Sequence, residues 1–280
     1  MRELPVSLLR ETVASLLMEA NYRIPDDILQ ALREAAEREQ SELGRRTLEQ
    51  LVRNYEIAAA ERLPVCQDSG VTVVLVEMGQ DVHWVGGSLY EAIQEGIREG
   101  TRQGYLRRSV VGDPLVRKNT GDNAPGVVHV ELVPGDRVRV TVASKGFGSE
   151  NMSALRMLTP AEGVEGVRRF VLETVDRAGA NSCPPIIVGV GIGGTAEYAM
   201  LLARRALLRR VGEPHPWPEA ASLEGELLER VNALGIGPLG VGGRTTALAV
   251  HVELHSSHAS LLPVAVALQC HSARLRELVL

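Results

Sequence analysis

The stretch NSCPPIIVGVGIGGTAEYAMLLARRALLRR, residues 181–210, decides the fold class. Its residues 186–190 are an apolar run rich in β-branched side chains, which is typical of a buried strand. Glycines follow, and residues 195–210 then show helical periodicity. A buried strand that leads through glycines into a helix predicts a domain that combines a sheet with flanking helices.

The segments around this stretch predict further helices. Apolar side chains recur at three- and four-residue steps over residues 5–62, which predicts a helical N-terminal layer of about three helices. Ser88 and Glu91 form a capping-box pattern, which predicts a helix start. The helices predicted after the N-terminal layer cover residues 88–104, 151–158, 164–178, 195–210 and 223–233, with a closing helix at the C-terminus.

Strands are predicted between these helices. The run VTVVLVEMG, residues 71–79, predicts a mostly buried strand. Residues 127–133 and 137–143 alternate around a Pro-Gly-Asp turn, which predicts a hairpin. Two more strands are predicted at residues 246–254 and 263–268. We therefore expect a mixed α/β (α+β) fold with one domain over residues 1–280, in which residues 1–62 are a helical layer.

The composition excludes several classes of protein. Hydrophobic residues at 45% and charged residues at 23% are ordinary for a globular chain. A net charge of -5 lacks the basic footprint of a nucleic-acid-binding protein. Glu3 and Glu11 interrupt the apolar stretch that a signal peptide needs, and no segment is apolar enough to span a bilayer. We expect a cytoplasmic protein with neither a nucleic acid nor a membrane as partner.

Gly189, Gly191 and Gly194 match the pattern GxGxxG between a strand and a helix, which raises a dinucleotide site as one interpretation. A Rossmann unit would continue into a second strand, whereas here a proline-rich loop follows the helix. Close strand-helix packing is the favoured interpretation of these glycines, although the helix start could still hold an anion.

His251, His255 and His258 raise a zinc site as another interpretation. Residues 246–254 alternate with strand periodicity, so the three imidazoles would not converge as they would on a helix. A polar role in a cleft for one of these histidines is the favoured interpretation.

The chain has three cysteines, Cys66, Cys183 and Cys270, which lie far apart. The odd count excludes a disulfide scaffold, and three inert buried thiols remain one interpretation. Each cysteine, however, has polar or turn-forming neighbours, in PVCQDSG, NSCPP and QCHS. Three thiolates on a four-iron cluster leave one iron without a protein ligand, as a Lewis acid. An open iron of this kind suits a hydro-lyase, which removes a substrate hydroxyl as water.

Five segments resemble, in the same order, the iron-sulfur-dependent class I fumarate hydratases and L-tartrate dehydratases. They are PVCQDSG, LRRSVVGDPLVRKNTGDNAPG, ASKGFGSENMSAL, NSCPPIIVGVGIGG and GIGPLGVGGRTTALAVHVELHSSHASLLPVAVALQC. The resemblance covers residues 5–275 and is to the α subunit, or to the N-terminal domain of the fused forms. It implies a separate β chain of about 200 residues, the size of one domain, in a heterodimer or an α2β2 assembly. The resemblance also places the family's catalytic base, a threonine, on that second chain.

The resemblance implies roles for individual residues. Cys66, Cys183 and Cys270 correspond to ligands of a [4Fe-4S] cluster with one iron that lacks a protein ligand. Asp68 corresponds to a proton donor to the departing hydroxyl and to a substrate contact. The other implied substrate contacts are Gln67, Arg107, Gly146, Gly148 and His258. The loop of Gly146 and Gly148 usually reads KGGGSEN in the family, and this chain has Phe147 at the middle glycine.

The implied activity is the reversible dehydration of a small 2-hydroxy dicarboxylate. (S)-malate to fumarate is the preferred reaction, and L-tartrate to oxaloacetate is the alternative. A non-catalytic, cluster-carrying module is a further alternative. Three residues also have simpler interpretations: Arg107 as part of a solvated basic cluster, Asp68 as an Asx turn before Gly70, and His258 as a helix or loop cap.

Overall fold

The computed structural model describes residues 1–280, which form two compact units. Unit 1 consists of Met1–Pro25, Asn54–Phe147 and Ser272–Leu280, and unit 2 of Asp26–Arg53 and Gly148–His271. The mixed α/β class is confirmed. Because the segments of the units interleave, no single cut separates them, and one domain over residues 1–280 stays a prediction.

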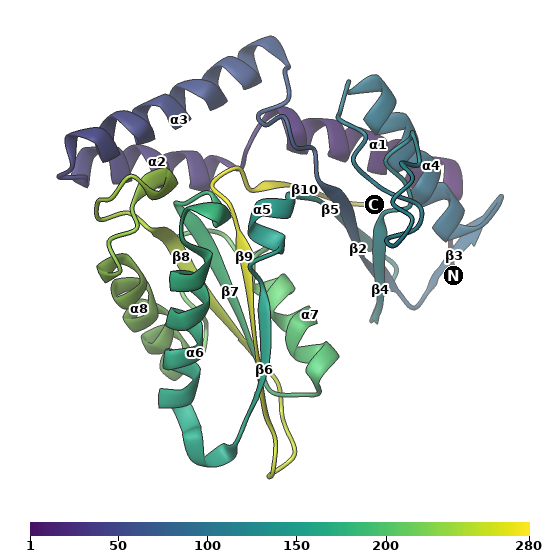
Figure 1. The fold of residues 1–280 in the computed structure, drawn as a ribbon. Coiled ribbons are helices and arrows are strands. Elements are labelled where there is room, and N and C mark those ends of the chain that lie inside the picture. Colours follow the sequence, from purple (N-terminus) through teal and green to yellow (C-terminus); the bar gives the residue numbers. More distant parts are fainter. The chain divides into compact units, whose positions relative to one another are not determined.

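Unit 1 contains a four-stranded mixed sheet with the order β10-β5-β2-β4 (Figure 1). Apolar side chains of α1 and α4 pack with those of β2 and β5 to form its core. A separate parallel pair joins β1 to β3. The elements are β1 (Arg2–Pro5), α1 (Val6–Tyr22), β2 (Val71–Gly79), β3 (Val82–Val85), α4 (Leu89–Gln103), β4 (Val127–Val133), β5 (Val138–Lys145) and β10 (Arg274–Val279).

The predicted hairpin of residues 127–143 is wrong in its pairing, although both strands exist. β2 lies between them, parallel to β4 and antiparallel to β5. The connection between β4 and β5 crosses the end of β2, where Gln80 N donates to Val133 O and Asp81 N to Gly135 O. The apolar run of β2 is buried over most of its length, so the interior of the sheet suits it better than an edge.

Unit 2 contains a second four-stranded sheet with the order β6-β9-β7-β8. β7 is parallel to β8 and antiparallel to β9, and β9 is antiparallel to β6. The elements are α2 (Asp26–Arg38), β6 (Ala154–Leu158), α6 (Gly163–Ala178), β7 (Ile186–Ile192), α7 (Ala196–Ala206), α8 (Pro218–Ala233), β8 (Ala247–Leu254) and β9 (Leu262–Gln269). Short 3-10 helices cover Pro160–Glu162, Gly179–Ser182 and Pro238–Gly240.

The alternation of side chains along β7 explains how helices cover this sheet. Ile186, Val188 and Val190 are buried in one core with side chains of α6 and α8. Gly189 and Gly191 point to the other face, where a Cβ would lie 2.2 Å and 2.0 Å from carbonyl oxygens of α7. Figure 1 shows α7 on one side of this sheet and α6 with α8 on the other. Close packing therefore accounts for these two glycines. The next element after α7 is the helix α8, not the strand that a Rossmann unit would require there.

Two helix predictions are wrong. Residues 154–158 form β6 after one helical turn, α5 (Phe147–Glu150), and the C-terminus forms β10 instead of a closing helix. Both strands contain leucine and arginine, which favour helices, but β9 and β5 offer hydrogen-bonding edges that override this preference.

The three helices predicted over residues 5–62 are present as α1, α2 and α3 (Glu42–Glu61), while their arrangement as one layer stays a prediction. The third helix contributes its first part to unit 2 and its last part to unit 1. Ser88 caps α4 as predicted, since its hydroxyl accepts from Glu91 N. None of the helices combines the length and the hydropathy that crossing a membrane requires.

Candidate functional site

Asp68 is the centre of the predicted site residues in unit 1. Its side chain is 8% exposed, and both carboxylate oxygens accept backbone hydrogen bonds. Oδ1 accepts from Gly70 N at 3.0 Å, which closes the Asx turn, and Oδ2 accepts from Phe147 N at 3.0 Å. The turn therefore exists, and the second oxygen joins Asp68 to the KGFG loop.

Arg274, which the sequence analysis missed, is hydrogen-bonded to the loop of Asp68. It is 2% exposed, and its Nη1 donates to the main-chain oxygen of Asp68 and to Asn21 Oδ1. A Cβ on Gly146 would lie 3.2 Å from both Arg274 Nη2 and Asp68 Oδ2. The sequence signals this residue only by its place shortly after Cys270, because local periodicity does not reveal a buried charge.

Arg107 follows a segment that is hydrogen-bonded to the Asp68 loop. Its backbone N donates to Ser69 Oγ at 2.8 Å. Asn123 reinforces the connection, since its Nδ2 donates to Gly70 O while its Oδ1 accepts from Ser109 N. The Arg107 side chain is exposed, and its guanidinium has no hydrogen bond or ion pair within the chain. It therefore remains able to bind an anion.

Cys66 and Gln67 precede Asp68 in the same loop. Cys66 is half-buried, and its Sγ accepts from Asp68 N at 3.4 Å. The thiol can donate to Gln67 Oε1, 3.5 Å away, and the Gln67 side chain is exposed. Unit 1 thus brings together Cys66, Gln67 and Asp68, with the backbone of Arg107 beside them.

Cys183 and Cys270 belong to unit 2, where two loops hold them near each other. His271 N, directly after Cys270, donates to Cys183 O at 3.3 Å. Cys183 is exposed and has a left-handed backbone with φ 54°, while Cys270 is buried. A Cβ on Gly148 would lie 3.9 Å from Cys183 Sγ. None of the three cysteines is in a disulfide bond.

The histidines of unit 2 do not converge. His251 is buried on β8 with Nδ1 3.0 Å from Ala206 O, and burial followed by the charge of Arg209 lowers its pKa. His255 and His258 are exposed, and His258 Nδ1 accepts from Ser260 N at 3.1 Å, which makes it the loop cap that the sequence offered as an alternative. Neither unit by itself gathers three or more His, Cys, Asp or Glu side chains that could hold a metal ion.

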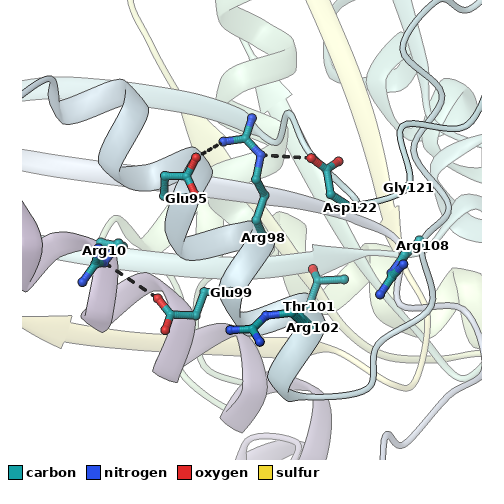
Figure 2. Close-up of a pocket in the computed structure, with 9 residues that line it drawn as sticks. All are labelled: Arg10, Glu95, Arg98, Glu99, Thr101, Arg102, Arg108, Gly121 and Asp122. Carbon is teal, nitrogen blue, oxygen red and sulfur yellow. Dashed lines mark hydrogen bonds and ion pairs between the residues drawn. The ribbon is translucent and has the colours of Figure 1, made fainter.

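A pocket of about 350 Å³, lined mainly by charged side chains, lies along α4 in unit 1 (Figure 2). Its central arginine, Arg98, bridges Glu95 and Asp122, and Arg10 lies 3.7 Å from Glu99. The remaining lining residues are Thr101, Arg102, Arg108 and Gly121. Most of its charges are neutralised within the chain, and no predicted site residue lines it.

Comparison with known proteins finds one family and two named relatives that match almost the whole chain. The sequence profile described as fumarate hydratase (Fumerase) matches residues 10–279. A Methanocaldococcus jannaschii protein, provisionally named L(+)-tartrate dehydratase subunit alpha, is 43% identical over 271 residues, which are 94% of each chain. The L(+)-tartrate dehydratase subunit alpha of Escherichia coli K12 is 34% identical over 272 residues, which are 96% of this chain and 89% of that one. This chain belongs to the fumarate hydratase (Fumerase) family.

Proposed function

We propose that this chain is the α subunit of a hydro-lyase that reversibly dehydrates a small 2-hydroxy dicarboxylate. The observation that carries the proposal is the family match over residues 10–279, together with relatives that are named as α subunits. Those names support a separate β chain, which we propose completes the active site in a heterodimer or α2β2 assembly. The proposed location is the cytoplasm.

We propose a [4Fe-4S] cluster with Cys66, Cys183 and Cys270 as its ligands. Soft thiolates are the ligands that iron-sulfur clusters use, and none of the three cysteines is in a disulfide bond. Cys66 belongs to unit 1, and Cys183 and Cys270 belong to unit 2. When bound, such a cluster supplies a Lewis-acidic iron for the substrate hydroxyl.

The chain's own residues would bind the substrate and move the proton. Arg107, whose guanidinium has no partner within the chain, is the proposed clamp for a substrate carboxylate. Asp68 is the proposed proton donor to the departing hydroxyl, held in place by Gly70 and Phe147 N–H groups. The further substrate contacts proposed are Gln67, Gly146, Gly148 and His258.

Two substrates are candidates within this class. (S)-malate, giving fumarate, is the substrate that the sequence analysis prefers, and the description of the matching family favours it. L-tartrate, giving oxaloacetate, is the second candidate, and the names of the relatives favour it. The two substrates differ by one hydroxyl, which a β chain could recognise.

The test is anaerobic co-purification with a β chain, followed by turnover of malate and L-tartrate. The reconstituted protein should hold about four irons and show broad visible absorbance, and Cys183→Ser should lose both. A colourless chain that is indifferent to Cys183→Ser would refute the cluster and favour a module without this chemistry. Iron without turnover of either substrate would favour a non-catalytic, cluster-carrying module.

A further inference from the structure

A buried carboxylate without a role in the proposed chemistry lies at the C-terminal end of α2 in unit 2. Glu39 is 6% exposed and follows Arg38, the last residue of that helix. The C-terminal end of a helix carries partial negative charge, so a buried carboxylate is costly there unless donors compensate it. The hydrogen-bond donors that offset this cost show which segments of the chain the Glu39 carboxylate binds.

Glu39 receives hydrogen bonds from two segments of the chain. One segment directly follows Glu39, and the other begins at Arg244. Oε1 accepts from Gln40 N at 2.9 Å and Ser41 N at 3.0 Å. Oε2 accepts from Arg244 N at 2.9 Å and Thr245 N at 3.2 Å. Burial raises the pKa of the Glu39 carboxyl, but the backbone N–H donors together lower it below its usual value. The ionised carboxylate therefore clamps residues 244–245 to the end of α2.

Residues 244–245 directly follow a glycine-rich loop, residues 235–243 (GIGPLGVGG). Gly243 has φ +124°, and a Cβ there would lie 2.9 Å from the carboxylate of Glu39. Gly237 has φ +70°, and its Cβ would lie 2.1 Å from the carbonyl of Gly242. Glycine at these positions lets the loop fold tightly on itself and reach the clamp.

The tip of this loop contacts the backbone on both sides of Cys183. Leu239 N donates to Pro184 O at 2.8 Å. A Cβ on Gly240 would lie 2.5 Å from Ala180 Cβ, which shows how closely the two segments approach. Cys183 has φ 54°, a conformation that a residue other than glycine keeps only where its surroundings impose it. Leu239 and Gly240 supply part of that constraint.

We infer that Glu39 is a positioning residue for Cys183. It fixes the glycine-rich loop, and the loop holds the backbone of Cys183 in the left-handed conformation that leaves this cysteine exposed. The meaning of Cys183 as a cluster ligand rests on the proposed function, whereas the coupling between Glu39 and the Cys183 loop does not.

Hydrogen exchange on the full chain, without a cluster, tests the coupling. Glu39→Gln should raise amide exchange about tenfold or more in residues 235–246 and also in residues 179–185, with the β6 and β9 pairing unchanged. Glu37→Gln is the matched control, because Glu37 is exposed in the last turn of α2, two residues before Glu39. Wild-type exchange at residues 179–185 in Glu39→Gln would overturn the inference.

A pair of glycine variants separates this coupling from general loosening of the loop. Gly240→Ala and Gly235→Ala impose similar strain, at φ +79° and +69°, but only Gly240 faces Ala180, while the space at Gly235 is open. Gly240→Ala should raise exchange at residues 179–185, and Gly235→Ala should not. Equal effects of the two variants would rule out the loop tip as the carrier.

Iron retention separates the inference from the proposed function. After anaerobic reconstitution, Glu39→Gln should lose iron to a chelator about tenfold faster than Glu37→Gln does. Loss at the wild-type rate would overturn a role for Glu39 in holding the ligand. If the wild-type chain binds no iron, the proposed function fails, while hydrogen exchange still decides whether Glu39 controls the Cys183 loop.

Discussion

Backbone groups do most of the positioning around Asp68. Phe147 stands at a position where the resemblance implies a glycine, yet its N–H still donates to Asp68 Oδ2, and the residue is 64% exposed. Any residue except proline supplies this N–H group, which explains how the loop tolerates Phe147. The neighbouring Gly146 is different, because a Cβ there would be tight against Arg274 and Asp68.

Arg107 and Arg108 form a matched pair for testing the carboxylate clamp. Both side chains are exposed, but Arg108 lines the pocket along α4 and Arg107 does not. Arg107→Lys should raise KM for the dicarboxylate roughly tenfold, because an ammonium cannot bind a carboxylate bidentately. Arg108→Lys should leave KM unchanged. Steady-state kinetics of the α and β pair measure both, and equal increases in KM would favour a general basic patch.

His251 should make the stability of the chain depend on pH. Burial lowers its pKa from the ordinary value of 6.5, so the folded state prefers the neutral ring. This contribution is present above pH 6.5 and is lost as the pH falls through the folded-state pKa. Urea unfolding of the chain should therefore show a decline below pH 6.5 that His251→Gln reduces.

His83→Gln is the control for this measurement, because His83 is exposed on β3. At neutral pH, His251→Gln should cost about 1 kcal/mol through its lost hydrogen bond to Ala206 O. An unchanged pH profile in His251→Gln would assign the decline to other groups.

At the scale of elements, the position of β2 and the packing of α7 shape the two sheets. β2 occupies the centre of its sheet, between two strands whose sequence pattern predicts a hairpin. β7 brings α7 close because two of its residues lack side chains. In the first sheet, β2 separates two strands that local pattern would pair with each other. In the second sheet, β7 packs against the helix that directly follows it in sequence.

Gly191 offers a direct test of the packing between β7 and α7. Gly191→Ala places a Cβ 2.0 Å from Ala199 O, so α7 must shift, and we expect a loss of about 1–3 kcal/mol in the free energy of unfolding. Gly225→Ala on α8 is the control, since nothing lies within 4 Å of its Cβ, and it should be neutral or slightly stabilising. Urea unfolding of both variants measures the difference, and equal stabilities would refute the packing argument.

At the scale of the whole molecule, the proposed function divides the chemistry among several parts. Asp68 and Arg107 belong to unit 1, Cys183 and Cys270 to unit 2, and the catalytic base is expected on a β chain. Relatives named as α subunits agree with a function that needs a second chain. The assembled enzyme, rather than the isolated chain, is therefore the species to assay.

The α chain with its β chain should turn over malate or L-tartrate at least about a hundredfold faster than the α chain alone, because removal of the general base costs about that much. The comparison requires equal iron content in both samples, measured before each assay. Turnover by the α chain alone at the rate of the pair would contradict the shared active site.

The candidate residues were predictable from sequence to different degrees. Cys66, Asp68 and Arg107 stand in short motifs, so resemblance alone nominates them. Arg274 and Glu39 do not stand in such motifs. Their importance follows from their burial and from their hydrogen bonds to segments distant in the chain. An isolated charged residue in a sequence carries no sign that folding will bury it.

The sequence by itself determined the mixed α/β class, the N-terminal helices, the strand β7 and the family, since periodicity and motifs act over a few residues. Only the tertiary structure decided that β2 separates β4 from β5 and that residues 154–158 and the C-terminus become strands. It also decided that Glu39 meets the glycine-rich loop. The physical reason is that strand pairing and the burial of charge depend on partners that local sequence does not contain.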